Sequence, residues 1–515
     1  MLNRRDLLKN SAVLAAIAAL GLKPDQVLAA DGDLLKIRME ADIQVLDPGY
    51  MIGGAETSVQ YACLPRLAVP VQDASGVWNW EALDYVEKIA QDDPTTISFT
   101  LKPGFMWNGD LGEVTADDVK FSFERMLKSD WAARWPTLDR VDVKDKYNGV
   151  IVLKSPFAAT FLMGIASESG SIVPKAAVEK LTDMKFTTEL PGQCGPYMMV
   201  EWTPKQKVVL KANPDWKGKK PAFPEVQFIN IEDTSAAELA FEAGEVAITN
   251  VLPEAAARYL AKMPAGAKMS RQAGPYYTWI GMNTEHELLK DIRVRKAIQR
   301  AIDVKSILEA AYGGTAPLAH GIIPLGITGN RQASKYSYNP DEAKALLAEA
   351  GVSGLTLEFK TLNEAYRVTA AQIVQANLAD VGITLNIIPV DAGPFWNLGL
   401  QSKGEDWKTL QLWWMRFRTS PDPSDTMQWF IKSQVGVWNW ERWSDPEYED
   451  IWTKGLAETD TAKRNELYIR AQEIMEDTGA YVWITHDPLN YMHSDKIVPG
   501  FDSGGEVLAE LVRKA

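Results

Sequence analysis

The alternation of apolar and polar residues predicts a strand followed by a helix between Ile97 and Lys128. Apolar side chains occupy every second position of 97–101, the period of a strand with one buried face, and Pro103-Gly104 ends that strand. Thr115 stands at the N-cap position of the helix, with two aspartates in its first turn and apolar residues at helical spacing after them. The segment therefore predicts strand, turns and capped helix in one run.

In the second half of the chain, segments with the period of a strand alternate with segments with the period of a helix. The pattern predicts strands at 276–283, 355–359, 383–387 and 480–485, and helices at 294–308 (closed by Gly313-Gly314), 340–350 and 366–381. A strand, a helix and a strand of these lengths form a βαβ unit, which requires parallel strands and a right-handed crossover. This half is therefore predicted to be α/β.

Several motifs resemble those of one family, the family 5 solute-binding proteins of ABC importers, typified by dipeptide- and oligopeptide-binding proteins. The matching residues are Leu101-Lys102-Pro103-Gly104, Trp107-Asn108-Gly109, Thr115-Ala116-Asp117-Asp118-Val119, Phe121-Ser122, Gly195-Pro196-Tyr197, Lys211–Trp216, Tyr276–Asn283 and Ile292–Ile298. The turn at Trp107-Asn108 departs from the usual His-Asp of the family. The resemblance extends over nearly the whole chain after its leader.

The resemblance implies a two-lobed periplasmic-binding-protein fold of α/β class, type II-like and of the large peptide-binding subclass, with mixed sheets and two hinge crossings. The expected domains are a signal peptide at 1–30, lobe I at 31–273 with a family-specific extra subdomain, lobe II at 274–485, and a C-terminal return to lobe I at 486–515. The first hinge is expected near 272–284. Ligand is then expected between the lobes.

The N-terminus predicts export. Arg4-Arg5 begin a basic region, an apolar run follows from Ser11 to Leu22, and small residues end it at Ala29-Ala30. The twin arginines favour the twin-arginine pathway, and an ordinary Sec signal is the alternative. Either route predicts a soluble periplasmic protein. The leader carries a net charge of +2 out of the total of −14, which leaves the mature chain near −16 and argues against nucleic acid as a partner.

The two cysteines leave two interpretations open. An exported protein permits a disulfide between Cys63 and Cys194, and the alternative is two small buried residues that never meet.

The segment from Trp413 to Pro423 carries the hypothesis about the solute. In peptide-binding relatives an aspartate of this region pairs with the peptide ammonium, and here the region contains Arg416 and Arg418, with Asp422-Pro423 kept. Because guanidinium binds carboxylate through two parallel hydrogen bonds, we expect a peptide-like solute, an opine or a sugar conjugate with an acidic or neutral polar end. Two salt-bridged surface arginines are the alternative.

The tryptophans keep a second solute class open, because indole rings stack on the faces of oligosaccharides. By the resemblance, Met51 and Gly54 border the ligand. The candidate ligand-binding residues are Met51, Gly54, Trp107, Tyr277, Trp396, Trp413, Trp414, Arg416, Arg418, Asp422 and Trp438.

No catalytic or metal site is expected. The four histidines are His286, His320, His486 and His493, and none forms a metal-binding pair, while a nucleophile elbow and a phosphate-binding glycine loop are both missing from the sequence. We expect no cofactor and a monomeric protein. The expected partners are a small-molecule solute and an ABC permease. A secreted hydrolase and a periplasmic chaperone or chemoreceptor ligand carrier are the competing classes.

Overall fold

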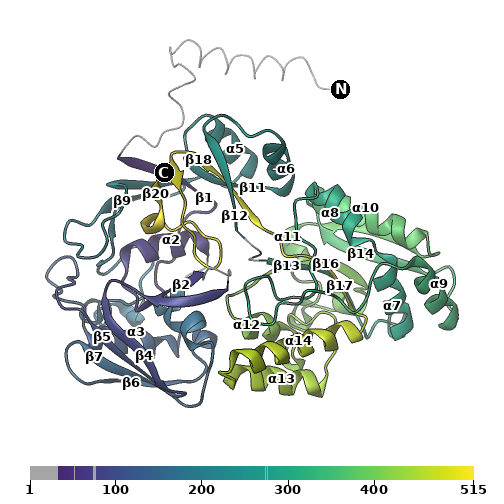
Figure 1. Ribbon diagram of the computed structural model, residues 1–515, viewed down its shortest axis with the longest axis horizontal. Coiled ribbons are helices and arrows are strands. Elements are labelled where there is room, and N and C mark those ends of the chain that lie inside the picture. The colour runs from purple at the N-terminus through teal and green to yellow at the C-terminus, as the bar shows by residue number, and fades with distance from the viewer. Residues whose placement is uncertain (1–32, 51–52, 73–76, 273, 275) are drawn as a thin grey trace, which may run out of the picture.

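The computed structural model describes residues 33–50, 53–72, 77–272, 274 and 276–515. Figure 1 shows two lobes side by side, each built on its own sheet, with the C-terminus on the first lobe. The expected α/β fold of two lobes with mixed sheets is therefore confirmed. The leader at 1–30 and the candidate Met51 lie outside the described residues.

Lobe I is built on a seven-stranded mixed sheet. Its strands, in spatial order, are β12 (Ala267–Gln272), β18 (Leu489–Ser494), β11 (Ile248–Val251), β1 (Leu34–Met39), β10 (Glu225–Asn230), β9 (Lys207–Ala212) and β8 (Tyr197–Thr203). The helices of this lobe are α2 (Gly54–Cys63), α3 (Ala116–Met126), α4 (Lys175–Val178), α5 (Thr234–Glu242) and α6 (Pro253–Ala261). Strand β1 lies between β10 and β11 and is parallel to both.

A smaller four-stranded antiparallel sheet extends lobe I. Its strands are β4 (Val86–Asp93), β5 (Thr96–Leu101), β7 (Asn148–Leu153) and β6 (Leu138–Val143), and a hairpin of β2 (Ala68–Gln72) and β3 (Trp78–Ala82) lies beside it. The predicted strand is β5 and the predicted helix is α3. Thr115 and Asp118 form a reciprocal capping box at the start of α3. One hydrophobic core joins the two parts of the lobe.

The cysteines lie at a junction inside lobe I. Both are buried free thiols, and the backbone N–H of Cys194 donates to the carbonyl of Cys63 at 3.0 Å. The two residues therefore do meet through their backbones.

Lobe II is built on a five-stranded mixed sheet. Its strands, in spatial order, are β15 (Thr384–Val390), β14 (Thr356–Leu362), β16 (Leu412–Arg418), β13 (Tyr276–Met282) and β17 (Tyr481–Thr485). Strands β14 and β15 are parallel and are joined through α10 (Ala365–Ala379), which confirms the predicted βαβ unit.

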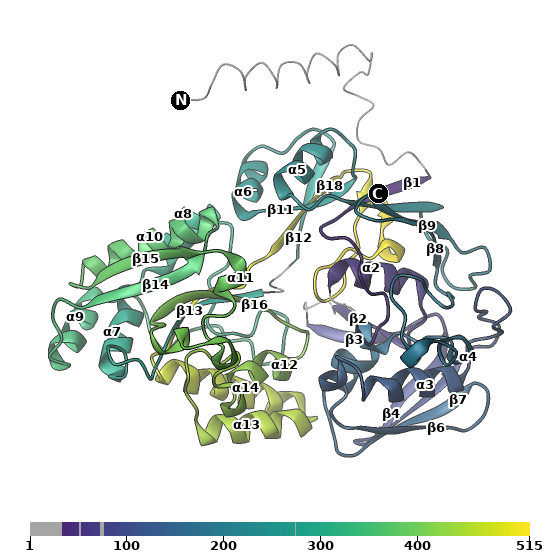
Figure 2. The same cartoon turned by 180° about the vertical axis from the view of Figure 1, so that it is seen from behind.

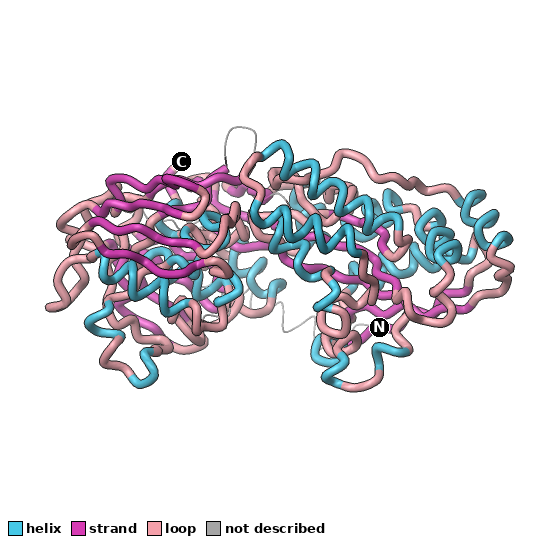
Figure 3. The backbone as a smooth tube through the Cα atoms, turned by 90° about the horizontal axis from the view of Figure 1, so that it is seen from below, coloured by secondary structure: helices cyan, strands magenta, loops and turns pink. Residues whose placement is uncertain are grey.

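Helices cover the lobe II sheet on both faces, as Figure 3 shows from below. The helices are α7 (Ile292–Ala301), α8 (Val304–Tyr312), α9 (Pro340–Glu349), α10, α11 (Ala392–Phe395), α12 (Pro423–Met427), α13 (Pro446–Ala457) and α14 (Thr461–Asp477). Alternate residues of one strand belong to different cores, since Trp414 packs in one and Trp413 in the other. A sheet covered on both faces buries successive residues of a central strand, and in β16 this holds from Leu412 to Met415.

The predicted helix at 294–308 is wrong in one respect, because the structure divides it into α7 and α8. Ile302 is extended at the end of α7, and the side chain of Asp303 then accepts hydrogen bonds from the backbone N–H groups of Lys305 and Ser306. Aspartate as an N-cap starts a new helix at this point. Gly313 ends α8 in the left-handed conformation, as predicted.

The chain crosses between the lobes twice, as Figure 2 shows from behind. Strand β12 belongs to the lobe I sheet and β13 to the lobe II sheet, and the chain returns between β17 and β18. The segment His486–Pro488 forms this second crossing, and the residues after it pack on lobe I, where β19 (Ile497–Val498) pairs with β20 (Arg513–Lys514). Both crossings lie at the inner end of the space between the lobes.

Candidate functional site

A cleft of about 460 Å³ lies between the lobes, and we call it the outer cleft. Lobe I contributes residues of α2, of the segment 130–134 and of the turn 502–504, and lobe II contributes the segment from Arg418 to Trp429. This volume lies within the range of about 300–1,000 Å³ that small-molecule sites occupy. Opposed surfaces of two lobes therefore enclose a space suited to a small organic molecule.

A second space of about 220 Å³, the inner pocket, lies beside both crossings. Its lining includes Tyr276 from the first crossing, Asp487 from the second, Tyr312 from the end of α8 and Arg367 from α10. Two buried donors in this lining have no hydrogen-bond partner: the hydroxyl of Tyr312, 1% exposed, and the Nη1 of Arg367, 4% exposed. A buried donor without a partner costs free energy, so an acceptor that reached either group would be favourable.

Arg416 and Arg418 both line these spaces, and each one meets a carboxylate. Arg416 lines the inner pocket, donates through Nε to Asp487 at 2.7 Å and stacks over the ring of Tyr276. Arg418 lines the outer cleft, donates to the carbonyl of Gly504 at 3.0 Å and lies 3.4 Å from a carboxylate oxygen of Glu506. Strand alternation correctly predicted that the two side chains share one side, but their charges are already balanced by the protein.

Burial shifts the pKa values of the carboxylates around Arg418. Burial raises the pKa of Glu506 to about 7 and that of Asp502 to about 6, although Arg418 opposes both shifts. Burial also raises the pKa of Asp425 on the other wall. The pKa of Glu168 is lowered, because the guanidinium groups of Arg134 and Arg418 outweigh the effect of its burial. The cleft therefore holds carboxylates that titrate near neutral pH.

Three of the predicted tryptophans are core residues and line none of the described pockets. Trp107 is 2% exposed and packs in the core of lobe I, while Trp413 and Trp414 are fully buried on opposite faces of the lobe II sheet. Tyr277 is 1% exposed and stacks on Trp279. For Tyr277, Trp413 and Trp414 the physical reason is the covering of the lobe II sheet on both faces, and Trp107 is enclosed by the core of lobe I, so these rings have no surface for a solute.

Asp422 has a structural position. Both carboxylate oxygens accept hydrogen bonds from Arg464, at 2.7 and 2.9 Å, and the side chain also caps α12 through the N–H of Ser424. The residue is 1% exposed. Its oxygens are therefore occupied within lobe II.

Trp396 and Trp438 are half-buried and are brought together by Phe417, which packs edge-on against Trp438 and nearly parallel to Trp396. Neither tryptophan lines the described pockets. Gly54 does border a cavity. A side chain at this position would collide with the carboxylate of Glu506. Of the predicted residues, the structure thus places Arg416 and Arg418 along the space between the lobes, and Gly54 at a pocket within lobe I.

Sequence reasoning missed several residues of the site. Arg367, Tyr312, Glu506 and Asp502 come from helix ends and from the C-terminal loop, and no short motif contains them. A turn at 502–506 is held by the side chain of Asp502, which accepts hydrogen bonds from the backbone N–H groups of Gly504 and Glu506. A glycine-rich turn between two acidic residues was the one local signal for this loop.

The described residues contain no group of three or more His, Cys, Asp or Glu side chains positioned to hold a metal ion. Their helices include none that is long and apolar enough to cross a membrane.

Two lobes joined by two crossings, with a cleft between them, are the architecture of a solute-binding protein. The family model for bacterial extracellular solute-binding proteins, family 5, matches residues 84–439, and the chain belongs to this family.

Two relatives cover nearly the whole chain. The probable D,D-dipeptide-binding periplasmic protein DdpA of Escherichia coli K12 is 28% identical over 488 residues, which span 92% of each chain. Di/tripeptide-binding protein 2 of Pseudomonas aeruginosa UCBPP-PA14 is 27% identical over 533 residues, which span 96% of each chain. Among solved structures, the ABC transporter substrate-binding protein CtaP from Listeria monocytogenes has the same fold, with a TM-score of 0.82 at 21% identity over 94% of this chain and 99% of that one.

Proposed function

We propose that the chain is the periplasmic binding component of an ABC importer and that its solute is a short peptide or a peptide-like molecule, such as an opine, with a carboxylate end. The relatives named as dipeptide- and tripeptide-binding proteins support the solute class. The twin-arginine leader supports export to the periplasm. The protein acts as a monomer that delivers its solute to the membrane permease.

The observation that carries the proposal is the pair of unpartnered donors on two side chains that line the inner pocket. The Nη1 of Arg367 and the hydroxyl of Tyr312 both lack acceptors, and both belong to buried side chains. A solute carboxylate supplies acceptor oxygens to both groups. A hydrogen bond to a charged group contributes roughly 1.5–3 kcal/mol, so this end of the pocket fixes the orientation of the solute.

Closure of the lobes encloses the solute. Two backbone hydrogen bonds already join the lobes: Trp78 donates to the carbonyl of Gly326 at 3.0 Å, and Ala158 donates to that of Leu456 at 2.9 Å. Rotation about the two crossings opens and closes this contact. The closed form presents both lobes to the permease.

Calorimetric titration with di- and tripeptides, acidic opines and cello- or galacto-oligosaccharides tests the solute class. Arg367→Gln removes the charge and is expected to weaken peptide binding by roughly 1.5–3 kcal/mol. Tyr312→Phe is expected to weaken it by about 1 kcal/mol, because only one neutral hydrogen bond is lost. Asp291→Asn, at the half-buried cap of α7 in the same lobe, is the control.

Peptide binding that is unaffected by Arg367→Gln and by Arg416→Ala contradicts the carboxylate position. Binding of oligosaccharides in place of peptides favours the second solute class, for which the half-buried group of Trp396, Phe417 and Trp438 is the supporting feature. Mass spectrometry of the recovered solute separates binding from hydrolysis, and unchanged solute is expected.

A further inference from the structure

The charges that line the space between the lobes are unequal. Carboxylates of the outer cleft are Asp130, Glu168, Asp425 and Asp502, against the guanidiniums of Arg134 and Arg418. Carboxylates of the inner pocket are Glu40, Glu364, Asp487 and Glu506, against the guanidiniums of Arg367 and Arg416. Among the described lining residues of these two spaces, none is lysine or histidine. Each space therefore carries twice as many acidic as basic side chains.

A third space of about 210 Å³, the lobe I pocket, continues from the inner pocket with the same sign of charge. It shares Glu40, Asn250, Tyr491 and Glu506 with the inner pocket, and it adds Asp42 and Glu56. Its one guanidinium, Arg38, donates to the carbonyls of Ile231 and Glu232 and to the side chain of Asn250, and it lies 4.0 Å from a carboxylate oxygen of Glu40. Asp42 and Glu56 form no ion pair among the described residues. The floor of this pocket is therefore negative.

The arginines of the cleft do not offset this excess. Arg416 pairs with Asp487, Arg418 with Glu506, and Arg367 with Glu364 at 2.5 Å. Arg38 and Arg134 also pair, with Glu40 at 4.0 Å and with Glu168 at 3.6 Å. Among the described lining residues, the carboxylates left without an ion pair are Asp130, Asp425 and Asp502 of the outer cleft and Asp42 and Glu56 of the lobe I pocket. A solute that adds another negative charge meets repulsion from these five groups.

We infer that the solute carries a net positive charge: a short peptide-like molecule whose carboxylate lies at Arg367 and Tyr312 and whose cationic side chain, of the lysine or arginine type, lies in the lobe I pocket against Glu40, Glu56 and Glu506. This inference rests on the proposed function and specifies its solute class. The unpartnered donors fix the carboxylate end, and the residues shared by the two pockets provide the path from that end to the acidic floor.

The protonation of Glu506 supplies a second readout. The charged and titratable groups that face it are Arg418 on β16, Asp502 on its own loop, Glu40 after β1, Glu168 beside the outer cleft and Tyr491 on β18. Burial raises the pKa of Glu506 to about 7, and the neighbouring carboxylates add to that effect. A bound cation lowers this pKa and releases protons, whereas a bound anion raises it and takes protons up.

Affinity for a cationic solute is therefore expected to rise between about pH 6 and about pH 8, with proton release on binding. A solute of net negative charge is expected to show the opposite slope. Calorimetry in two buffers of different ionisation enthalpy measures the protons directly.

The experiment compares tripeptides of equal length that differ in one side chain, Ala-Lys-Ala, Ala-norleucine-Ala and Ala-Glu-Ala, and their positional isomers, on the full mature chain. The lysine peptide is expected to bind about tenfold more tightly than its norleucine isostere, and the glutamate peptide most weakly. Glu40→Gln and Glu506→Gln are each expected to reduce the preference for lysine over norleucine several-fold. Glu87→Gln, exposed on β4, is the matched control and is expected to leave that preference unchanged.

Equal or tighter binding of the norleucine or glutamate peptides overturns the charge inference and leaves the proposed function standing. An unchanged preference in both Glu40→Gln and Glu506→Gln overturns the placement of the cation. Absence of binding by every peptide overturns the inference and the proposed function together.

Discussion

Glu441 is a buried acid whose charged form the fold disfavours. The side chain is 1% exposed, one oxygen accepts from the indole N–H of Trp279 at 2.7 Å, and the other has no partner. Burial raises its pKa from 4.5 to about 8. Below about pH 4.5 both folded and unfolded states are protonated and the stability is fully present, whereas between about pH 4.5 and about pH 8 only the unfolded state ionises. Stability is therefore lost as the pH rises.

Glu441→Gln removes this dependence, because glutamine stays neutral and keeps the acceptor for Trp279. The variant is expected to gain stability relative to the parent as the pH rises from about 5 to about 9, by roughly 4 kcal/mol at the upper end. Urea unfolding followed by tryptophan fluorescence at several pH values measures the difference. Parallel stability curves for the two proteins contradict this explanation.

At the residue scale, the sequence predicted the position of the charged side chains of β16 better than the burial of its tryptophans. Arg416 and Arg418 do line the space between the lobes, because strand alternation fixes that both side chains share one side. The burial of Trp413 and Trp414 was not predictable, since it depends on helices that come from distant parts of the chain. Arg367 was missed for the same reason, as its pocket is formed only when α10 meets the crossings.

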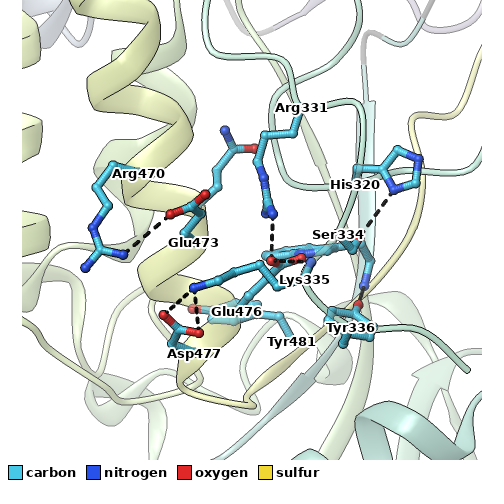
Figure 4. A network of polar contacts seen from close by, with 12 residues as sticks. His320, Arg331, Ser334, Lys335, Tyr336, Arg470, Glu473, Glu476, Asp477 and Tyr481 are labelled. Atoms are coloured by element: carbon cyan, nitrogen blue, oxygen red, sulfur yellow. Dashed lines mark hydrogen bonds and ion pairs between the residues drawn. The ribbon is translucent and has the colours of Figure 1, made fainter. Parts of the chain in front are cut away.

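The connection between α8 and α9 is a long loop that is tied to α14. Figure 4 shows Arg331 of this loop against Glu476, and Lys335 against Asp477. The first pair is buried, at 2.7 Å, and Glu476 also accepts from the indole of Trp483 on β17. The second pair is exposed, at 2.8 Å. Two neighbouring acids of one helix thus hold the same loop in different environments.

Glu476→Gln is expected to destabilise the protein by about 3–5 kcal/mol, because it leaves the charge of Arg331 buried without its counterion. Asp477→Asn is the control and is expected to cost less than about 1 kcal/mol, because water replaces the lost contact. Chemical denaturation of both variants measures the difference. Similar losses in the two variants contradict the assignment of the buried pair as the anchor of the loop.

At the element scale, helix caps, glycines and hydrophobic periodicity were sufficient to predict an element where no two of these signals disagreed. The N-cap at Thr115, the helix end at Gly313 and the βαβ pattern of 355–387 all appear as predicted. The single helix over 294–308 was wrong because an apolar face continues through Ile302 while the backbone does not. Periodicity reports which side is buried, and the cap at Asp303 decides where the helix begins.

At the scale of the whole molecule, motifs predicted two lobes and two crossings but not the surfaces on which the lobes meet. Those surfaces join segments that are far apart in the sequence, such as Trp78 with Gly326 and Ala158 with Leu456. None of these residues belongs to a periodic pattern that points to a partner. The contact exists only because each lobe has folded first, so its prediction requires the structure.

Leu456, in the last turn of α13, is the one lobe II residue in a small apolar contact with Phe157, Ala159 and Met163 of lobe I, counted over the described residues. This contact and the adjacent backbone hydrogen bond close the outer cleft on one side without any atom of the solute. Each lobe has its own core, so the contact contributes to closure and little to the folding of either lobe.

Leu456→Asp places a carboxylate against these apolar side chains and is expected to shift the population towards the open form. Small-angle scattering without added solute is expected to show a larger radius of gyration than for the parent, and solute affinity is expected to fall about tenfold, because binding then has to pay for closure. Leu239→Asp, at a position 67% exposed on α5, is the control for an added charge. An unchanged radius together with unchanged affinity would show that the lobes are held by the crossings alone, whereas a loss of thermal stability equal to that of a core substitution would place Leu456 in the fold of lobe II.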